Sequence, residues 1–253
     1  MFPDVILEVI LDYLPKFELL DWININNLNF FLLCENANAI HMIKPHIYNI
    51  DWYRLSKNKN AICLLLQHKH KIDWKILSKN ENAIFLLQQN ISKINWKGLS
   101  QNSNAIQLLA QNKDKIDWVN LSKNPNAIEL LIQNQDKINW KNLSLNPNAM
   151  DLLEKNQDKI RWKQLSQNPN AIKLLLKYPH KIIWKNLSSN PNAILLLQQN
   201  VDKIDWTLLS SNPNAIHLLQ QNATKINWYH LSKNSGIFVP QDKNLIKKEF
   251  KNI

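Results

Sequence analysis

Hydrophobic residues recur along this chain with a period of 22 residues. From Trp52 to Trp228 every interval between neighbouring tryptophans is 22, and the copies follow the pattern W-x-x-L-S-x-N-P-N-A-I-x-L-L-x-x-N-x-x-K-I-D/N. A unit this short cannot bury its own apolar face, so it is stabilised by stacking on its neighbours. The pattern therefore predicts a repeat solenoid, and we expect a rod-like stack whose interior is lined by indole rings.

Each unit contains signals for two helices. With the tryptophan counted as position 0, Asn124 at position 6 and Pro125 at position 7 are typical of a helix start. The asparagine side chain accepts a bond from a free backbone amide, and proline has no amide hydrogen that would need a partner. The Ala-Ile-x-Leu-Leu run that follows has helical spacing, which predicts a helix of about nine or ten residues. We expect Asn134 to close that helix in a left-handed conformation.

A second, shorter segment begins at the residue before each tryptophan. Asp117 is suited to cap it, and Ile116 with Leu121 has the spacing of a hydrophobic staple. We expect a short helix or 3₁₀ turn that ends at the serine of position 4. The predicted fold is all-α: an αα solenoid of short two-helix repeats with N- and C-terminal helical caps.

The alternative fold is a leucine-rich-repeat horseshoe, which also uses units of about this length. Position 5 would be an inward apolar residue there, but it is polar in Lys57, Gln101 and Lys123. The helical Ala-Ile-x-Leu-Leu run also favours helices over strands.

Three regions follow from where the repeat begins and ends. The array starts at Phe30, which occupies the tryptophan position, and its last matching unit fades at Ser235, so the solenoid is expected over 30–235. Residues 236–253 are predicted to form a half-polar closing helix. Residues 1–29, which include Trp22, are predicted to form a helical cap, with one helix ending before Pro15 and a second beginning near Lys16.

The N-terminal residues carry a resemblance to the F-box. Its typical opening, Leu-Pro-x-Glu-Ile-Leu followed by an aromatic Tyr-Leu run and an Asp-Leu-Leu helix, is matched by Phe2, Pro3, Ile6, Leu7, Ile10, Tyr13, Leu14, Leu19 and Leu20. Val5 departs from the pattern, since an acidic residue is usual there, and the array begins before a full F-box would end.

The resemblance implies docking to a Skp1-type adaptor of a cullin ubiquitin ligase through those nine residues. The competing interpretation is that the same apolar residues only cap the solenoid. The N-P-N-A-I-x-L-L array itself resembles short repeats in proteins of large DNA viruses of amoebae. Such viruses also carry F-box proteins with other repeats, which favours the adaptor hypothesis.

Position 11 is the most variable position of the unit and is the candidate target-binding site. It holds Cys63 in the second unit and then Phe85, Gln107, Glu129, Asp151, Lys173, Leu195 and His217. Position 14 shares its helix face. The leading hypothesis is a non-enzymatic adaptor whose solenoid binds a target protein, and the alternative is a structural or scaffolding repeat protein with no link to ubiquitin.

Charge adds a third, less favoured interpretation. The chain has 31 Lys and Arg against 20 Asp and Glu, a formal net charge of +11, and a lysine recurs three residues before each tryptophan from Lys71 to Lys225. Nucleic acid would follow such a ladder through its phosphates. Nearby aspartates and the apolar surface under the lysine stems favour a solvated edge instead. We therefore expect protein partners, with nucleic acid unlikely and no membrane contact.

No catalytic or metal-binding pattern is evident. The seven histidines are scattered, Cys34 and Cys63 lack metal-ligand spacing, and with two glycines there is no phosphate-binding loop. The sequence predicts no enzyme, no cofactor, reduced cysteines and a soluble cytoplasmic protein, located in the host cytoplasm if the source is viral.

Overall fold

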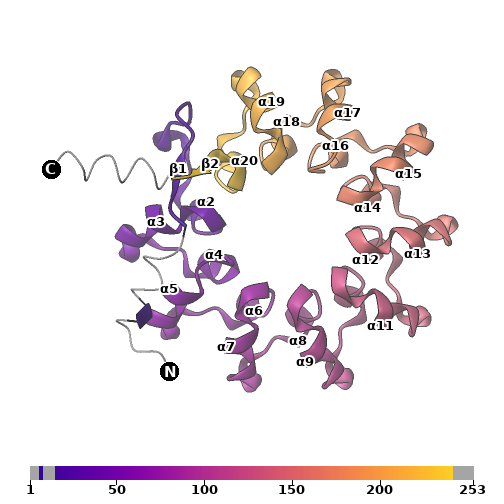
Figure 1. Cartoon of the computed structure of the whole chain (residues 1–253), viewed down its shortest axis with the longest axis horizontal. Helices are drawn as coiled ribbons and strands as arrows, with labels where there is room; N and C mark the ends of the chain where they lie inside the picture. The colour runs from indigo at the N-terminus through magenta and orange to yellow at the C-terminus, as the bar shows by residue number, and fades with distance from the viewer. Residues whose placement is uncertain (1–5, 8–14, 242–253) are drawn as a thin grey trace.

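The computed structural model describes residues 6–7 and 15–241, and within them the units form a closed ring (Figure 1). The all-α solenoid architecture is confirmed, with short helices throughout and one two-stranded sheet among the described residues. The expected rod is wrong, because the first and last units lie side by side. The ring holds ten units, which begin at Phe30 and at the nine tryptophans from Trp52 to Trp228.

The inner layer of the ring is made by the short helices that begin at position 0 (Figure 1). They are α2 (Phe30–Leu33), α4 (Trp52–Lys57), α6 (Trp74–Leu77), α8 (Trp96–Leu99), α10 (Trp118–Leu121), α12 (Trp140–Leu143), α14 (Trp162–Leu165), α16 (Trp184–Leu187), α18 (Trp206–Leu209) and α20 (Trp228–Leu231). The preceding Asp or Asn caps most of them, as Asp117 does by accepting from the Asn120 amide at 2.8 Å.

The outer layer is made by the helices that begin at position 10. They are α3 (Ile40–Ile43), α5 (Ile62–Gln67), α7 (Ile84–Gln88), α9 (Ile106–Ala110), α11 (Ile128–Ile132), α13 (Met150–Glu154), α15 (Ile172–Lys177), α17 (Ile194–Gln198) and α19 (Ile216–Gln221). The run expected as one helix is divided, since Pro125–Ala127 forms the 3₁₀ helix η9 before α11. Asn124 caps η9, as expected of a helix start, by accepting from the Asn126 amide at 3.0 Å.

A third segment, which the sequence did not predict, returns the chain to the next unit. It is a 3₁₀ turn such as η10 (Gln135–Lys137), and Asn134 precedes it with φ −135° and ψ 55°. The expected left-handed conformation of Asn134 is therefore wrong. Its side-chain amide instead donates to the Leu130 carbonyl at 2.9 Å, which satisfies a carbonyl at the end of α11.

Three side chains of each unit form the core. The leucines at positions 3 and 13 and the alanine at position 9 have between 0 and 2% of their surface exposed in every unit that carries them. Alanine at position 9 leaves room for the backbone of the neighbouring unit to approach closely. The tryptophans are only partly buried and pack against the edge of this core, so the indole rings flank the interior and do not line it.

Neighbouring units are joined by a ladder of buried asparagines at position 6. We call this set the asparagine ladder: Asn36, Asn58, Asn80, Asn102, Asn124, Asn146, Asn168, Asn190, Asn212 and Asn234. Each side-chain amide donates to two carbonyls of the preceding unit, at positions 4 and 6, over 2.7 to 3.2 Å. This repeated bond fixes the spacing and the rotation between units.

The same bonds close the ring. Asn36 of the first unit donates to the Ser232 and Asn234 carbonyls of the last at 3.2 and 3.1 Å. The Asn29 amide donates to the Ser232 hydroxyl at 2.8 Å, as the equivalent amides do to position 4 of the unit before them. The seam between the two ends of the array is therefore an ordinary unit interface.

A small antiparallel sheet fastens the seam from outside the array. Strand β1 (Phe17–Leu19) pairs with β2 (Phe238–Pro240), with Glu18 opposite Val239. The helix expected to begin near Lys16 is wrong, because these residues are extended and bonded to the end of the chain. The closing helix expected over 236–253 is wrong where the structure describes it, because a 3₁₀ turn (Ser235–Ile237) leads directly into β2. The rest of that helix, from 242 on, lies outside the described residues, as does the helix expected before Pro15 apart from two helical residues, Ile6 and Leu7.

Candidate binding surfaces

The candidate target-binding residues at position 11 lie on the outer circumference of the ring. Phe85, Gln107, Glu129, Asp151, Lys173, Leu195 and His217 are all exposed, and we call them the outer strip. They follow the outer helices from α7 to α19 (Figure 1). Helical spacing accounts for this exposure, because positions 9, 12 and 13 face the core and leave position 11 outside.

Large apolar side chains occur on the outer strip without being packed. Phe85 has 67% of its surface exposed and Leu195 has 77%. At position 14, on the same helix face, Ile132 is 49% exposed and Leu176 is 56% exposed. Leu176 and Leu195 belong to adjacent units.

The N-terminal residues predicted to bind an adaptor have different surroundings. Leu7 is 3% exposed and lines a cavity of about 580 Å³ with Ile62, Leu66, Trp74 and Phe85, whereas Ile6 is 43% exposed. Leu19 and Leu20 are half-buried at the seam, where the Leu20 amide donates to the Ile237 carbonyl. Phe2, Pro3, Ile10, Tyr13 and Leu14 lie outside the described residues. Leu7, Leu19 and Leu20 are thus already packed against the ring.

The lysine ladder of position 19 covers the tryptophans. In six units the ammonium lies over the indole ring of its own unit, 4.5 to 4.7 Å from the centroid, with the pairs Lys93–Trp74, Lys115–Trp96, Lys137–Trp118, Lys159–Trp140, Lys203–Trp184 and Lys225–Trp206. Where position 16 is aromatic, that ring packs on the tryptophan instead, as His68 does on Trp52 and Tyr178 on Trp162. This arrangement favours the interpretation of the ladder as a solvated edge whose lysines cover apolar rings.

A surface that the sequence reading missed lies on the inner helices, at position 1. Its residues are exposed in all ten units: Phe31, Tyr53, Lys75, Lys97, Val119, Lys141, Lys163, Lys185, Thr207 and Tyr229. We call them the inner wall, because they lie on the inner helices and because positions 0, 3 and 4 of the same helices pack against the core, which leaves position 1 on the opposite helix face. The available signal was variation at position 1 beside a tryptophan that recurs in nine of the ten units.

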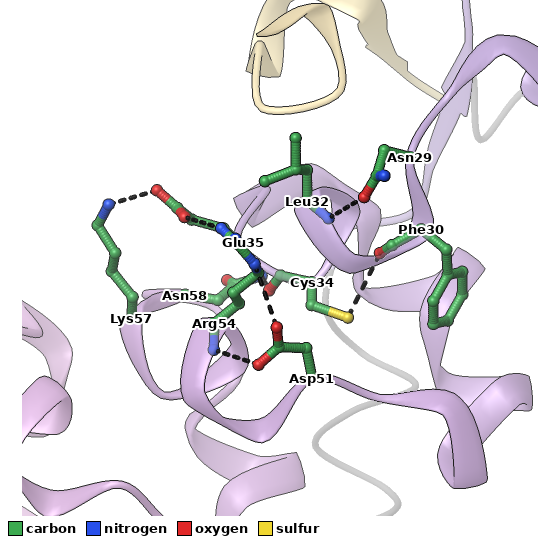
Figure 2. Close-up of polar contacts among 9 residues, drawn as sticks. All are labelled: Asn29, Phe30, Leu32, Cys34, Glu35, Asp51, Arg54, Lys57 and Asn58. Carbon is green, nitrogen blue, oxygen red and sulfur yellow. Dashed lines mark hydrogen bonds and ion pairs between the residues drawn. The ribbon is translucent and has the colours of Figure 1, made fainter. Parts of the chain in front are cut away.

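Position 5 lies next to the inner wall and is also rich in lysine. A cavity of about 430 Å³ is lined by Glu35, Lys57, Lys79, Gln101 and Lys233, which are the position 5 residues of five consecutive units across the seam. Glu35 accepts bonds from both Arg54 and Lys57, and Arg54 also pairs with Asp51 at 3.1 Å (Figure 2). The acidic group at position 5 is therefore already neutralised within the structure.

The described residues contain no group of three His, Cys, Asp or Glu side chains placed to hold a metal ion. Burial raises the pKa of the Cys34 thiol, and a hydrogen bond from the Asp51 backbone offsets part of the rise. Burial also raises the pKa of Cys63. Both thiols are therefore neutral and weakly reactive near pH 7. Cys34 takes the place of the usual serine and donates to the Phe30 carbonyl (Figure 2).

Within the described ranges, no helix is both long enough and apolar enough to cross a bilayer. No protein-family model matches the chain, and neither a curated protein nor a solved structure does.

Proposed function

We propose that this protein is a non-enzymatic interaction ring whose outer strip binds a target protein. The observation that carries the proposal is the exposure of the strip in every unit from α7 to α19, with Phe85 and Leu195 left unpacked. Exposed apolar side chains among polar ones are typical of protein interfaces. The asparagine ladder supports the proposal, because its bonds link every unit to the next and so limit the conformational entropy that the strip loses on binding.

The adaptor role implied by the F-box resemblance is less well supported. Docking to an adaptor through Leu7 requires that residue to leave its cavity beside Phe85, and docking through Leu19 or Leu20 competes with the seam. The purely scaffolding alternative leaves the unpacked side chains of the outer strip without a role. Target binding at the outer strip is therefore the function that the geometry supports best.

Photo-cross-linking tests the proposal. A photoreactive amino acid is placed at Leu195 on the outer strip or, as the control, at Thr207 on the inner wall. We expect one protein to be captured from Leu195 and to bind the purified ring saturably. The double variant Leu176→Ser and Leu195→Ser then weakens binding at least tenfold, since it removes two exposed apolar side chains. The control Gln198→Ser, on the same helix as Leu195, removes no apolar side chain and does not weaken it. Undiminished binding to the double variant, or capture only from Thr207, contradicts the proposal.

Adaptor recruitment is tested separately with purified Skp1. Leu7→Asp is expected to expose the cavity beside Phe85 and to lower stability, because a charge replaces a buried side chain. If the N-terminus only covers the ring, the wild-type protein shows no measurable contact with Skp1. Saturable Skp1 binding that Ile6→Asp abolishes would restore the adaptor hypothesis, since Ile6 is exposed and its change leaves the cavity intact.

A further inference from the structure

We propose that the inner wall binds single-stranded nucleic acid, with aromatic rings stacking on the bases and lysines holding the phosphates. This site is separate from the outer strip and from the lysine ladder over the tryptophans. It goes beyond the protein-binding role, because it assigns a second ligand class to the other face of the ring.

The first support is an aromatic arc that exists only because the ring closes. Tyr229 belongs to the last unit, Phe31 to the first and Tyr53 to the second, so the seam places the three in consecutive units. Their side chains are 51, 56 and 57% exposed. The Tyr229 ring also packs edge-on against His230, with the centroids 5.7 Å apart. Three large, half-exposed rings at the same helix position of adjacent units offer a platform on which bases can stack.

The second support is the charge that continues from this arc. Five of the other seven inner-wall residues are lysines, namely Lys75, Lys97, Lys141, Lys163 and Lys185, and position 5 adds Lys57, Lys79, Lys123 and Lys233. Of the inner-wall lysines, Lys185 lies 3.9 Å from a carboxylate, that of Asp205. Glu35, the acid at position 5, is bound by Arg54 and Lys57. Lys57 and Lys185 are thus paired with acids, and Glu81, which lines the cavity at position 5, lies 3.8 Å from Lys59. The other lysines still leave the surface with an excess of positive charge, which attracts a polyanion.

The combination of rings and lysines favours single strands over other polyanions. In a duplex the base faces are stacked on each other and are not available to Phe31 or Tyr53, so only the lysines would contribute. An acidic peptide would use the lysines but would leave the three rings exposed to water. A flexible single strand satisfies both sets of side chains, and its backbone can follow the curvature of the ring.

The test measures the fluorescence polarization of a labelled oligothymidine of about 16 nucleotides as the full-length protein is added, between about 50 and 200 mM salt. The inner variant carries Lys97→Glu, Lys141→Glu and Lys163→Glu. Its matched control carries Lys113→Glu, Lys155→Glu and Lys173→Glu, three exposed lysines outside the inner wall. Both variants have the same net charge, so general electrostatic attraction is equal in the two.

The inner variant is expected to lose at least tenfold in affinity at low salt, with a salt slope lower by about three, roughly one per lysine. The control variant is expected to change less than threefold. Phe31→Ala, Tyr53→Ala and Tyr229→Ala each weaken binding roughly 5-fold or more without changing the salt slope, whereas Phe85→Ala on the outer strip has no effect. Circular dichroism checks that every variant keeps its helical content.

Four results would overturn the proposal. They are the absence of binding by the wild-type protein at low salt, equal losses in the inner and control variants, unchanged affinity in the three aromatic variants, and equal affinity for a duplex of the same length. A polyglutamate peptide that competes as strongly as unlabelled oligothymidine would assign the surface to acidic peptides. That result would also reject the proposal.

Discussion

At the residue scale, the asparagine at position 6 does more than cap a helix. In Asn146 the side-chain oxygen accepts from the Asn148 amide at 3.0 Å, which is the capping role expected from the sequence. The amide group of the same side chain donates to the Ser122 and Asn124 carbonyls at 3.2 and 2.7 Å. The sequence predicted the first function because capping is local. The second depends on the distance to the neighbouring unit, which the repeat pattern does not specify.

Replacement of a ladder asparagine is therefore expected to destabilise the ring strongly. Asn146→Ala removes three bonds at a residue with no exposed surface: those to the Ser122 and Asn124 carbonyls and that from the Asn148 amide. The Asn124 carbonyl keeps only its bond from the Ala127 amide. We expect a loss of about 2 to 4 kcal/mol in the free energy of unfolding, measured by chemical denaturation. Asn148→Ala is the control, since its amide makes one exposed bond between units, and we expect a loss of about 1 kcal/mol or less. Equal losses would contradict the ladder as the main link.

The lysine at position 19 gives a smaller prediction at the same scale. Lys137→Gln removes the ammonium that lies 4.6 Å from the Trp118 centroid, and the expected loss is about 0.5 to 1 kcal/mol. Lys137→Arg is expected to retain most of the stability, because a guanidinium also lies well on an indole ring. Lys71→Gln is the matched control, since His68 packs on Trp52 in that unit. Denaturation followed by tryptophan fluorescence measures all three variants, and a loss for Lys71→Gln equal to that for Lys137→Gln would rule out the contact.

At the element scale, the sequence predicted where helices begin better than where they end. Asp and Asn before the tryptophan and Asn before proline act as expected, because each bonds to an amide two or three residues later. Asn134 was assigned wrongly, since a side-chain bond to Leu130 closes the helix without the left-handed backbone. The strand β1 was missed for a different reason. Its partner lies at the other end of the chain, and no local pattern distinguishes Phe17–Leu19 from a helix turn.

Two inner helices lack a capping side chain, which allows a stabilising substitution. Arg161 precedes α14 and Ile183 precedes α16, and neither caps its helix, although both have nearly the same backbone angles as Asp117. Arg161→Asn is expected to raise the free energy of unfolding by about 1 kcal/mol, because its oxygen reaches the Gln164 amide as Asn139 reaches Asn142. Arg161→Ala removes the same charge without adding a cap. If the two variants have the same denaturation midpoint, the missing cap is not a weakness of this unit.

At the scale of the whole molecule, closure is the property that the sequence could not predict. The 22-residue period establishes that the units are equivalent, and equivalence is compatible with a rod, an open superhelix or a ring. The choice depends on the small rotation that each interface adds. That rotation follows from the geometry of the asparagine ladder and the serine bonds, not from the pattern of hydrophobic residues. The aromatic arc of the inner wall could not be predicted for the same reason, because only a closed ring brings the unit of Tyr229 beside that of Phe31.

Closure predicts that the number of units is fixed by the interface geometry. Deletion of residues 118–139 removes one complete unit and joins Asp117 to Trp140. Every other interface along the chain keeps its sequence, and the new one keeps the serine of position 4 and the asparagine of position 6, Ser100 and Asn102. Because each interface contributes nearly the same rotation, nine units leave a gap of about one unit at the seam. The bonds from Asn29 and Asn36 to the last unit then cannot form together with all the others.

Electron paramagnetic resonance between spin labels at Asn27 and Lys233 measures how far the seam opens. We expect one short distance in the full-length ring and a longer, broader distribution in the deletion variant, with helical circular dichroism per residue unchanged. An equally short and narrow distance in both proteins would mean that the interfaces bend to fit, and that closure is imposed by β1 and β2 and not by the repeated units.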